Sequence, residues 1–341
     1  MRVLVLGGTR MLSKAVAAEV VGRGHDVVCA ARGTSGLVPG GARLVRIDRN
    51  EPDAYAPLSG GWFDAVVDVA WMSYRWVTEA LRALGDNAGH WTFVSSMNVY
   101  ADKNTCGQGI DAPLVEPVRG EGDPGQQDPP DRYGGVKVAS EMAVREAVGD
   151  RAFVLRSGLI VGPDDPTDRF GYWPARLSRG GRVVVPDVPD QLTQYVDVRD
   201  LASWVVDAAE SRLVGTFDGA CAPLPLGKLL GGVAAVVAPP GTELVPVAPK
   251  VLTEMGVSPW AGPNSLPLWL PAGCAGFTAH DVAPSLAAGL RIRPLADTVR
   301  AALADERRRG LDRPGVAGLT PTKENEVLSG LDGEPIFAPN G

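Results

Sequence analysis

The sequence has few of the residues that build metal centres and disulfide frameworks. Its four cysteines (Cys29, Cys106, Cys221 and Cys274) are far apart and form no Cys-x-x-Cys pair, and its three histidines do not cluster. This pattern predicts free thiols and no metal site. The chain also lacks a run of about 18 apolar residues that could cross a bilayer, and its first residues show no signal-peptide pattern. We therefore expect a cytoplasmic protein with no membrane partner.

Lysine is scarce as well, with six in 341 residues, and the net charge is −7. A chain of this charge has no basic surface that would coat phosphates, so we expect no nucleic-acid partner. With 45% hydrophobic and 21% charged residues, the composition is typical of a globular protein with a sizeable interior. The length favours about two domains.

Short β-branched runs alternate with helical stretches over the first half of the chain. This alternation is typical of βαβ units around a buried parallel sheet, and it predicts an α/β fold with a Rossmann-type doubly wound sheet. In the first helix, Ala15, Ala18, Val20 and Val21 are expected to face the sheet. We expect strands at residues 3–6, 26–30, 43–47, 65–70, 91–95 and 153–156, and helices at 12–23, 75–84 and 131–148.

The pattern changes at about residue 163, after which Pro and Trp become frequent and the clean alternation ends. This change predicts a second, smaller domain of α/β type that binds the substrate. Residues 321–341 are polar with Gly and Pro, which predicts a flexible tail. The expected ranges are 1–165 for a dinucleotide-binding Rossmann domain to which 190–220 return, and 166–189 and 221–320 for the substrate-binding domain.

The turn after the first predicted strand reads Gly7-Gly8-Thr9-Arg10-Met11-Leu12-Ser13 and leads into the first predicted helix. A dinucleotide pyrophosphate needs a tight turn, close approach of the backbone and a helix N-terminus with free N–H groups. In a Gly-x-x-Gly-x-x-Gly pattern the second and third glycines are replaced here by Arg10 and Ser13, so the turn alone is compatible with an ordinary loop. Its βαβ context favours a cofactor site. The candidate cofactor contacts of this region are Gly7, Thr9, Arg10, Met11, Leu12 and, at the end of the fourth strand, Ala70.

The end of the second predicted strand indicates which nicotinamide dinucleotide binds. An acidic residue there bonds the adenosine ribose of NAD, whereas an arginine accommodates the 2′-phosphate of NADP. The strand ends in Ala31-Arg32 without a carboxylate, and Arg10 offers a second cation. These residues favour NADP(H) over NAD, and the alternative is a solvated arginine in a loop. Asp48, after the third strand, is a candidate for contact with the adenine amino group.

Tyr133 and Lys137 lie four residues apart, on one face of a predicted helix. A tyrosine, whose reference pKa is about 10, needs assistance to act as acid or base near pH 7. A nearby lysine and the positive nicotinamide ring both favour the phenolate. Ser96, at the end of the fifth strand, is a candidate to hydrogen-bond the substrate's carbonyl or hydroxyl, with Ser95 as its competitor. The alternative for the first two residues is an exposed Tyr/Lys pair on a helix.

Four segments, in this order, resemble the extended short-chain dehydrogenase/reductases and, more narrowly, the NAD-dependent epimerase/dehydratase group. The resemblance covers about residues 1–300 and implies a Rossmann domain with a small C-terminal substrate domain. The segments are Gly7-Gly8-Thr9-Arg10, Ser95-Ser96-Met97-Asn98-Val99-Tyr100, Tyr133-x-x-x-Lys137 and Arg156-Ser157-Gly158-Leu159-Ile160-Val161-Gly162-Pro163.

The resemblance also implies roles for single residues. It implies catalysis by Ser96, Tyr133 and Lys137, because the family's serine lies four residues before the tyrosine of the Val-Tyr pair. Tyr133 and Lys137 would also contact the cofactor, and Ser157, Gly158 and Leu159 would lie along the nicotinamide. Family members often dimerise through the helix that bears the tyrosine, which implies a homodimer here.

Departures from the family pattern bear on the substrate. Sugar 4,6-dehydratases carry an Asp-Glu pair directly after the catalytic hydroxyl, where this sequence has Met97 and Asn98. Neither side chain can shuttle a proton, which argues against that mechanism, although other dehydratases of the family do without the pair. No arginine pair is clearly placed to hold a nucleotide diphosphate, for which the two candidates are Arg169 and Arg199. The candidate substrate residues are Trp71, Ser73, Asn98, Arg169, Tyr172 and Gln194; for the aromatic-rich segments among them, the alternative is packing between domains.

The sequence therefore predicts an NAD(P)-dependent enzyme that acts on a hydroxyl or keto group of a sugar-like or nucleoside-like small molecule. Epimerisation or dehydration would keep the cofactor bound throughout the reaction. An NADPH-dependent ketoreductase of a secondary metabolite is an alternative that suits Arg32, because it would exchange the cofactor in each turnover. A nucleotide-binding regulatory protein with a vestigial site is an alternative of another class.

Overall fold

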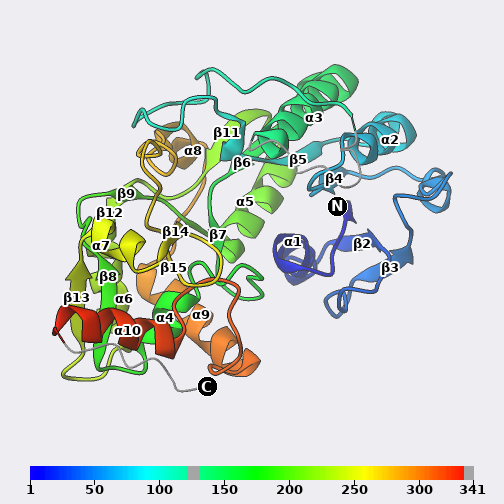
Figure 1. The fold of residues 1–341 in the computed structure, drawn as a ribbon. Helices are drawn as coiled ribbons and strands as arrows, with labels where there is room; N and C mark the ends of the chain where they lie inside the picture. Colours follow the sequence, from blue (N-terminus) through cyan, green and yellow to red (C-terminus); the bar gives the residue numbers. More distant parts are fainter. Residues whose placement is uncertain (121–130, 334–341) are drawn as a thin grey trace. The chain divides into compact units, whose positions relative to one another are not determined.

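The computed structural model describes residues 1–120 and 131–333 and divides the chain into two compact units (Figure 1). The second unit is formed by Val161–Gln194, Pro223–Thr278 and the chain from Arg293 onward. The first unit is formed by Met1–Ile160, Tyr195–Ala222 and Ala279–Ile292.

Seven parallel strands form the central sheet of the first unit, in the order β11-β6-β5-β4-β1-β2-β3. The order reverses between β1 and β4, and at such a switch point the carboxyl ends of the strands open a crevice for a ligand. The predicted doubly wound Rossmann-type sheet is thus confirmed. The strands are β1 (Arg2–Leu6), β2 (Asp26–Ala31), β3 (Arg43–Arg46), β4 (Ala65–Asp68), β5 (Trp91–Ser96), β6 (Ala152–Ser157) and β11 (Gly215–Gly219).

Two pairs of helices bury the two faces of this sheet. Because side chains alternate along a strand, Val3 and Val5 of β1 join one core while Leu4 and Leu6 join the other. The first core lies under α1 (Met11–Gly22) and α5 (Val198–Ser211), and the second under α2 (Tyr74–Leu84) and α3 (Arg132–Val148).

The predicted inner face of α1 is confirmed for Val20, which is buried, and for Ala15 and Val21, which pack partly buried against the core, and it is wrong for Ala18. Val16, Ala17 and Val20 are buried, whereas Ala18 is exposed. The helix packs on α5 as well as on the sheet, and this second neighbour rotates the buried face toward Val16 and Ala17. An alanine-rich helix carries too little contrast in hydrophobicity to fix its own orientation.

The second unit combines short strand pairs with helices and is of α/β type. Strand β8 pairs in parallel with β13, β9 antiparallel with β12, and β14 in parallel with β15. Helix α6 packs against α4 and α9. The elements are α4 (Tyr172–Leu177), β8 (Arg182–Pro186), β9 (Leu192–Thr193), β12 (Leu224–Pro225), α6 (Leu226–Val237), β13 (Glu243–Val247), α7 (Pro249–Glu254), β14 (Ser258–Trp260), β15 (Ser265–Pro267), α9 (Leu295–Arg309) and α10 (Pro321–Leu331).

One segment that was predicted for the substrate-binding domain, Ala279–Ile292, lies in the first unit instead. Ala279–Ile292, with the short helix α8 (Ala283–Ala287), belongs to the first unit, since Val282 packs beside Met97 and Val99 in its core. This return is only fourteen residues long and interrupts a Pro/Gly-rich stretch, which hid it from sequence patterns. The remaining short strands, β7 (Ile160–Val161) and β10 (Val196–Asp197), lie where the chain passes between units.

The first part of the expected flexible tail is an ordered helix. Residues 321–331 form α10, which begins at the capping residue Thr320 and buries Glu324 and Val327. Glu324 accepts hydrogen bonds from Arg176 and from the Val184 backbone N–H, which explains why this polar segment is ordered. Residues 334–341 of the expected tail lie outside the described residues. No helix in the described parts of the chain is long and apolar enough to span a membrane.

Candidate active site

The turn between β1 and α1 requires glycine at its first two positions. Gly7 and Gly8 have φ angles of 139° and 106°, in the region that side chains disfavour. A Cβ on Gly8 would lie 2.4 Å from Sγ of Cys29 on the neighbouring strand, and a Cβ on Gly7 would lie 3.0 Å from Ser13. These two glycines therefore let the turn pack onto β2 and the start of α1.

The local structure at Arg10 and Ser13 explains why the two later glycines of the pattern can be absent. Arg10 is the N-cap of α1 in extended conformation (φ −136°), so it needs no glycine. Ser13 donates its hydroxyl to the Arg10 carbonyl at 2.8 Å. The first turn of α1 begins at Met11, and the N–H groups of a first turn have no partner within the helix. The replaced glycines have therefore left a turn and a helix N-terminus of the kind that binds phosphate.

Three arginines lie around the carboxyl ends of β1, β2 and β3. Arg10 and Arg32 are exposed, and their side chains form no hydrogen bond or ion pair with the residues that the structure describes. Arg46, which the sequence reasoning missed, is paired in register with Ala31, and its Nε lies 3.4 Å from where a Cβ of Gly33 would be. Its signal was its place on the outermost strand, directly opposite the end of β2. Asp48 is half-buried and accepts the Asn50 N–H at 3.0 Å.

The two serines at the end of β5 have different partners. Ser95 is 1% exposed and donates its hydroxyl to Glu141 on α3 at 2.6 Å. Ser96 is 5% exposed, and its Oγ accepts hydrogen bonds from the backbone N–H and the side-chain amide of Asn98, at 3.2 and 3.0 Å. The Ser95 hydroxyl is thus committed to a buried carboxylate, whereas Ser96 belongs to the start of the short 3-10 helix Met97–Val99.

Helix α3 carries Tyr133 and Lys137 on one face and approaches the loop after β5 closely. A Cβ on Gly134 would lie 2.3 Å from the Asn98 carbonyl oxygen, so this glycine permits the contact. The Lys137 Nζ lies 5.8 Å from the centroid of the Tyr133 ring, and the exposed Trp71 has its ring centroid 6.3 Å from that of Tyr133. The structure thus brings the predicted residues Trp71, Asn98, Tyr133 and Lys137 together around α3.

The ammonium of Lys137 is held by the ends of β4 and β5. It is 3% exposed and donates to the carbonyls of Ala70 and Val94, at 2.5 and 2.7 Å. Burial lowers the pKa of Lys137 to about 8, against the opposing influence of the carboxylates Asp68 and Glu141. Below about pH 8 the side chain is therefore a cation close to the Tyr133 phenol.

Two buried ion pairs that the sequence reasoning missed support this region. Asp68, at the end of β4, accepts both Nη atoms of Arg49, at 2.9 and 3.1 Å. Arg156 likewise grips Glu141 with two hydrogen bonds, at 3.0 and 2.9 Å. The only available signal was the position of a charged residue inside or next to an apolar strand. These pairs neutralise the charges that flank Lys137 without touching it directly.

The remaining predicted contacts of the first unit have visible structural roles. Ser73 caps α2 by accepting the Trp76 N–H at 3.2 Å. Ser157 donates to the Ser95 carbonyl at 3.1 Å, and Gly158 leaves room for Met97, whose sulfur would lie 3.0 Å from a Cβ there. Met97, at one position of the family's Asp-Glu pair, is therefore a packing residue.

The other three candidate substrate residues lie in the second unit. Gln194 is 1% exposed and Tyr172 is 9% exposed. Arg169 stacks its guanidinium over Trp260 at 5.1 Å. Tyr172 lines a cavity of about 630 Å³ between α4, the segment 311–321 and α10. This cavity is built wholly from the second unit, and it is not the place where Ser96 and Tyr133 lie.

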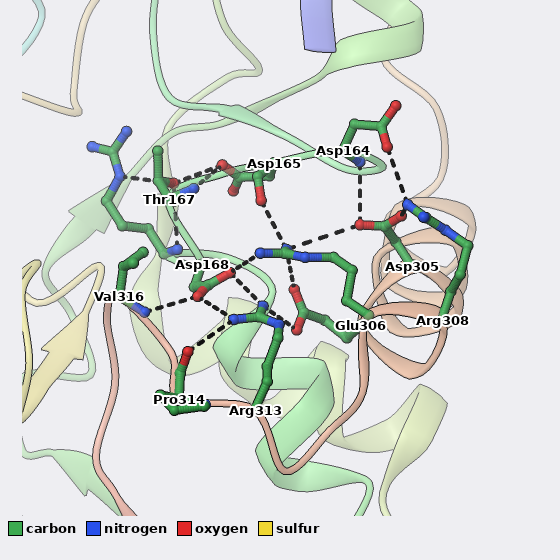
Figure 2. A network of polar contacts seen from close by, with 12 residues as sticks. Asp164, Asp165, Thr167, Asp168, Asp305, Glu306, Arg308, Arg313, Pro314 and Val316 are labelled. Atoms are coloured by element: carbon green, nitrogen blue, oxygen red, sulfur yellow. Dashed lines mark hydrogen bonds and ion pairs between the residues drawn. The ribbon is translucent and has the colours of Figure 1, made fainter. Parts of the chain in front are cut away.

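A polar network beside that cavity fixes the loop before α4. The carboxylate of Asp168 receives two hydrogen bonds from Arg313, at 2.6 and 2.8 Å, and Arg313 also donates to Glu306 at 2.7 Å (Figure 2). Arg309 lies 2.9 Å from Asp168 and donates to the Asp165 carbonyl. Figure 2 shows Asp168 of the loop, Glu306 of α9 and Arg313 of the segment after α9 pointing toward one another. The arginines and carboxylates of this network compensate each other's charge, and their hydrogen bonds hold the loop before α4 in place.

Comparisons with known proteins agree with this architecture. A sequence model of the NAD dependent epimerase/dehydratase family matches residues 3–216. The chain is 31% identical over 196 residues to 2′-dehydrokanamycin reductase of Streptomyces kanamyceticus, and the match covers 55% of this chain and 52% of that protein. The matched segment thus spans about half the length of this relative.

Solved structures share the fold over most of the chain. The Bordetella bronchiseptica enzyme WbmH in complex with NAD+ is 18% identical, with a TM-score of 0.64 over 91% of this chain and 99% of that chain. The NAD-dependent NDP-hexosamine 5,6-dehydratase TunA, involved in tunicamycin biosynthesis, is 16% identical, with a TM-score of 0.65 over 92% and 99%. The family match extends over well more than half of the 341 residues. The chain therefore belongs to the NAD dependent epimerase/dehydratase family, of extended short-chain dehydrogenase/reductase type, and it is an enzyme.

Proposed function

We propose that this enzyme uses NADPH to reduce a keto group on a sugar-like small molecule, with Tyr133, Lys137 and Ser96 as its catalytic residues. One observation carries the proposal. A buried lysine, a tyrosine one helical turn before it and a serine at the end of β5 are gathered at the carboxyl edge of a doubly wound sheet. Charge and hydroxyl groups in that arrangement serve proton transfer to a substrate oxygen.

The chain's residues fit a nicotinamide dinucleotide. The Gly7-Gly8 turn and the first turn of α1 offer backbone N–H groups to a pyrophosphate. Arg10, Arg32 and Arg46 would hold the 2′-phosphate of NADP(H), and the end of β2 has no carboxylate that would bond a ribose diol. Asp48 is the proposed contact of the adenine amino group. The further proposed cofactor contacts are Thr9, Met11, Leu12, Ala70, Tyr133, Lys137, Ser157, Gly158 and Leu159.

The residues of the site divide the reaction between them. The nicotinamide, when bound, supplies the hydride. Tyr133 donates its phenolic proton to the substrate oxygen, and Ser96 hydrogen-bonds the same oxygen. Lys137, charged below about pH 8, stabilises the phenolate that Tyr133 becomes after it has given up its proton.

Several observations favour a sugar-like ketone as the substrate. The relative with 31% identity is named as a reductase of 2′-dehydrokanamycin, which is an oxidised amino sugar compound. Trp71 is 70% exposed beside Tyr133, so its indole face is open to stack on a sugar ring. Of the two arginines considered for a nucleotide diphosphate, Arg199 is ion-paired to Asp197 at 2.7 Å and Arg169 lies over Trp260. We therefore favour a substrate without a nucleoside diphosphate, with Trp71 as its proposed contact in the first unit.

The test is a steady-state assay with defined ketones. Purified enzyme freed of bound nucleotide is mixed with NADPH and 2′-dehydrokanamycin, and absorbance at 340 nm is followed. We expect one equivalent of NADPH to be consumed per ketone reduced, with no loss of absorbance for Tyr133→Phe. Absence of NADPH consumption over a panel of keto sugars would refute the reductase assignment.

An epimerase or dehydratase that retains its cofactor is the second candidate, and the family match supports it. Such an enzyme returns the hydride to the molecule from which it came. Protein that co-purifies with tightly bound nucleotide and converts a sugar nucleotide without added NADPH would establish this candidate instead. Mass spectrometry of the released nucleotide distinguishes NAD from NADP in either case.

A further inference from the structure

A single residue, Asn98, donates both of the hydrogen bonds that the Ser96 hydroxyl accepts. The serine Oγ accepts the Asn98 backbone N–H at 3.2 Å and the Asn98 side-chain amide at 3.0 Å. Within residues 1–120 and 131–333, no group accepts a hydrogen bond from this Oγ. The serine proton is therefore available to an oxygen that is not part of the described chain.

A serine hydroxyl has two lone pairs and one proton. Asn98 uses both lone pairs, so any further partner of Ser96 must be a hydrogen-bond acceptor. We infer that Asn98 is a positioning residue that makes Ser96 a donor to the substrate oxygen throughout the proposed reduction. This inference rests on the proposed function and deepens it, because it assigns the direction of one hydrogen bond in the site.

The backbone around Asn98 is built to hold this arrangement. Ser96 is the N-cap of the 3-10 turn Met97–Val99, and its side chain accepts the backbone N–H of Asn98. Helix α3 passes so close at Gly134 that a Cβ there would lie 2.3 Å from the Asn98 carbonyl oxygen. The backbone of Asn98 thus packs against the same helix that presents Tyr133, and its side chain is held by the hydrogen bond to Ser96.

The direction of the hydrogen bond matters for the chemistry. As hydride reaches the carbonyl carbon, negative charge grows on the oxygen, and a donor fixed beforehand stabilises that charge at no cost of reorientation. A hydroxyl that could also turn its lone pairs toward the substrate would lose part of this effect. Sugar 4,6-dehydratases have a glutamate at this position, and an ionised carboxylate can only accept a hydrogen bond from the serine. The side-chain amide of Asn98 instead donates a hydrogen bond to the serine oxygen and leaves the serine proton for the substrate.

The first experiment exchanges the amide for a carboxylate of the same shape. In Asn98→Asp the new oxygen accepts the Ser96 proton, so we expect kcat for 2′-dehydrokanamycin with NADPH to fall about 10- to 100-fold at pH 7.5. KM for NADPH should change little. The activity should return as the pH is lowered, since a protonated carboxyl can donate to Ser96 again. Asn104→Asp, an exposed change in the next loop, is the matched control and should show neither effect.

A double-mutant cycle separates positioning from folding. If Asn98 acts through the serine hydroxyl, Asn98→Asp should reduce kcat no further in a Ser96→Ala background. An equal reduction in both backgrounds, or full activity of Asn98→Asp at pH 7.5, would overturn the inference while leaving the reductase assignment intact.

A second readout needs no turnover. With selective ¹⁵N-asparagine labelling, the side-chain amide of Asn98 is assigned by its loss in Asn98→Asp. We expect its proton shift to move upfield in Ser96→Ala, because a hydrogen bond is lost. An unchanged amide resonance contradicts the hydrogen bond itself. If this shift is seen but no ketone is reduced, the proposed function fails and the geometry of the pair stands.

Discussion

Lys137 and Glu141 lie on successive turns of helix α3 and are both buried, at 3% and 0% exposure, yet their charges are compensated in opposite ways. Burial alone would raise the pKa of Glu141, but hydrogen bonds from Arg156 and Ser95 hold it below its ordinary value. Lys137 meets two backbone carbonyls, and no carboxylate of the described chain lies within ion-pair distance of it. Burial therefore lowers its pKa to about 8.

The difference separates a structural charge from a reactive one. Glu141 is saturated by its partners and can change protonation only if the fold is disturbed. Lys137 has a charge that is incompletely compensated, and a bound anion or a phenolate at Tyr133 would complete it. Groups with such perturbed pKa values, next to a tyrosine and a serine, are typical of catalytic sites. The comparison predicts that removing Lys137 harms activity and removing Glu141 harms folding.

The largest effect is expected for Lys137→Met. We expect kcat/KM for ketone reduction to fall by about 10²- to 10⁴-fold, since the proton transfer loses its cationic neighbour. Folding should be retained, because a charge that is costly to bury is replaced by an apolar chain of similar length. NADPH consumption and circular dichroism measure the two quantities, with exposed Lys228→Met as the control.

The same variant has a second signature in the pH dependence of stability. Between about pH 8 and pH 10 the unfolded chain keeps the lysine proton that the folded protein has released. The free energy of unfolding contributed by this group therefore rises with pH over that window, by about 1.4 kcal/mol per unit. Urea unfolding at pH 7.5, 8.5 and 9.5 should show this rise in the wild type and not in Lys137→Met. Parallel curves for the two proteins would mean that Lys137 is ordinarily charged and paired.

The next largest effect is expected for Glu141→Gln. It leaves the Arg156 guanidinium buried without its carboxylate, which typically lowers the free energy of unfolding by about 3–5 kcal/mol. Glu146→Gln, an exposed change on the same helix, is the matched control. Should Glu141→Gln not fold, the double variant with Arg156→Leu tests the same point. We expect it to be more stable than Glu141→Gln, and equal instability of the two would show that the pairing is not what counts.

Much of this arrangement could be predicted from the sequence, and the parts that could not share a physical reason. Alternation of β-branched and helical runs is a local property, and it predicted six of the seven sheet strands to within two residues but missed β11 (Gly215–Gly219). Ser96, Tyr133 and Lys137 follow from motifs at fixed offsets along the chain. The Asp68–Arg49 and Glu141–Arg156 pairs join residues 19 and 15 positions apart, and no periodicity carries such a pairing. The return of Ala279–Ile292 to the first unit was missed for the same reason.

Helix α1 shows the same limit on a smaller scale. Its existence was clear from the strand and turn before it, but its buried face depends on α5, almost two hundred residues later. Ala15, Ala18, Val20 and Val21 were expected to face the sheet. Val20 is buried and Ala15 and Val21 are partly buried, but Ala18 is exposed. The alternative faces of α1 differ little in hydrophobicity, so packing against a helix distant in sequence decides which face is buried.

Asp218 is a third buried ionisable residue that can be compared with Lys137 and Glu141, because its charge is only partly compensated by neighbouring groups. It is 0% exposed and accepts the Tyr100 hydroxyl at 2.7 Å, and burial raises its pKa to about 7. Between about pH 4 and pH 7 the folded protein holds a proton that the unfolded chain has lost. The stability contributed by this group therefore falls as the pH rises through that window, by about 2–3 kcal/mol from pH 5 to pH 7. Urea unfolding of Asp218→Asn should lack this fall, and an unchanged fall would assign it to another group.

The smallest effect concerns Arg32, which is the opposite of Glu141 because it is exposed and forms no hydrogen bond or ion pair within the described part of the chain. A side chain in that state adds nothing to folding, so Arg32→Ala should leave the free energy of unfolding unchanged. It should raise KM for NADPH about tenfold, the size of one charge-assisted hydrogen bond to phosphate, because Arg10 and Arg46 would keep their own contacts with the 2′-phosphate. KM for NADH should not change, because NADH has no 2′-phosphate, and this makes the second cofactor an internal control. Arg46→Ala should act in the same direction. Equal changes in KM for both cofactors would place Arg32 at the pyrophosphate, and no change for either would leave NAD as the proper cofactor of this enzyme.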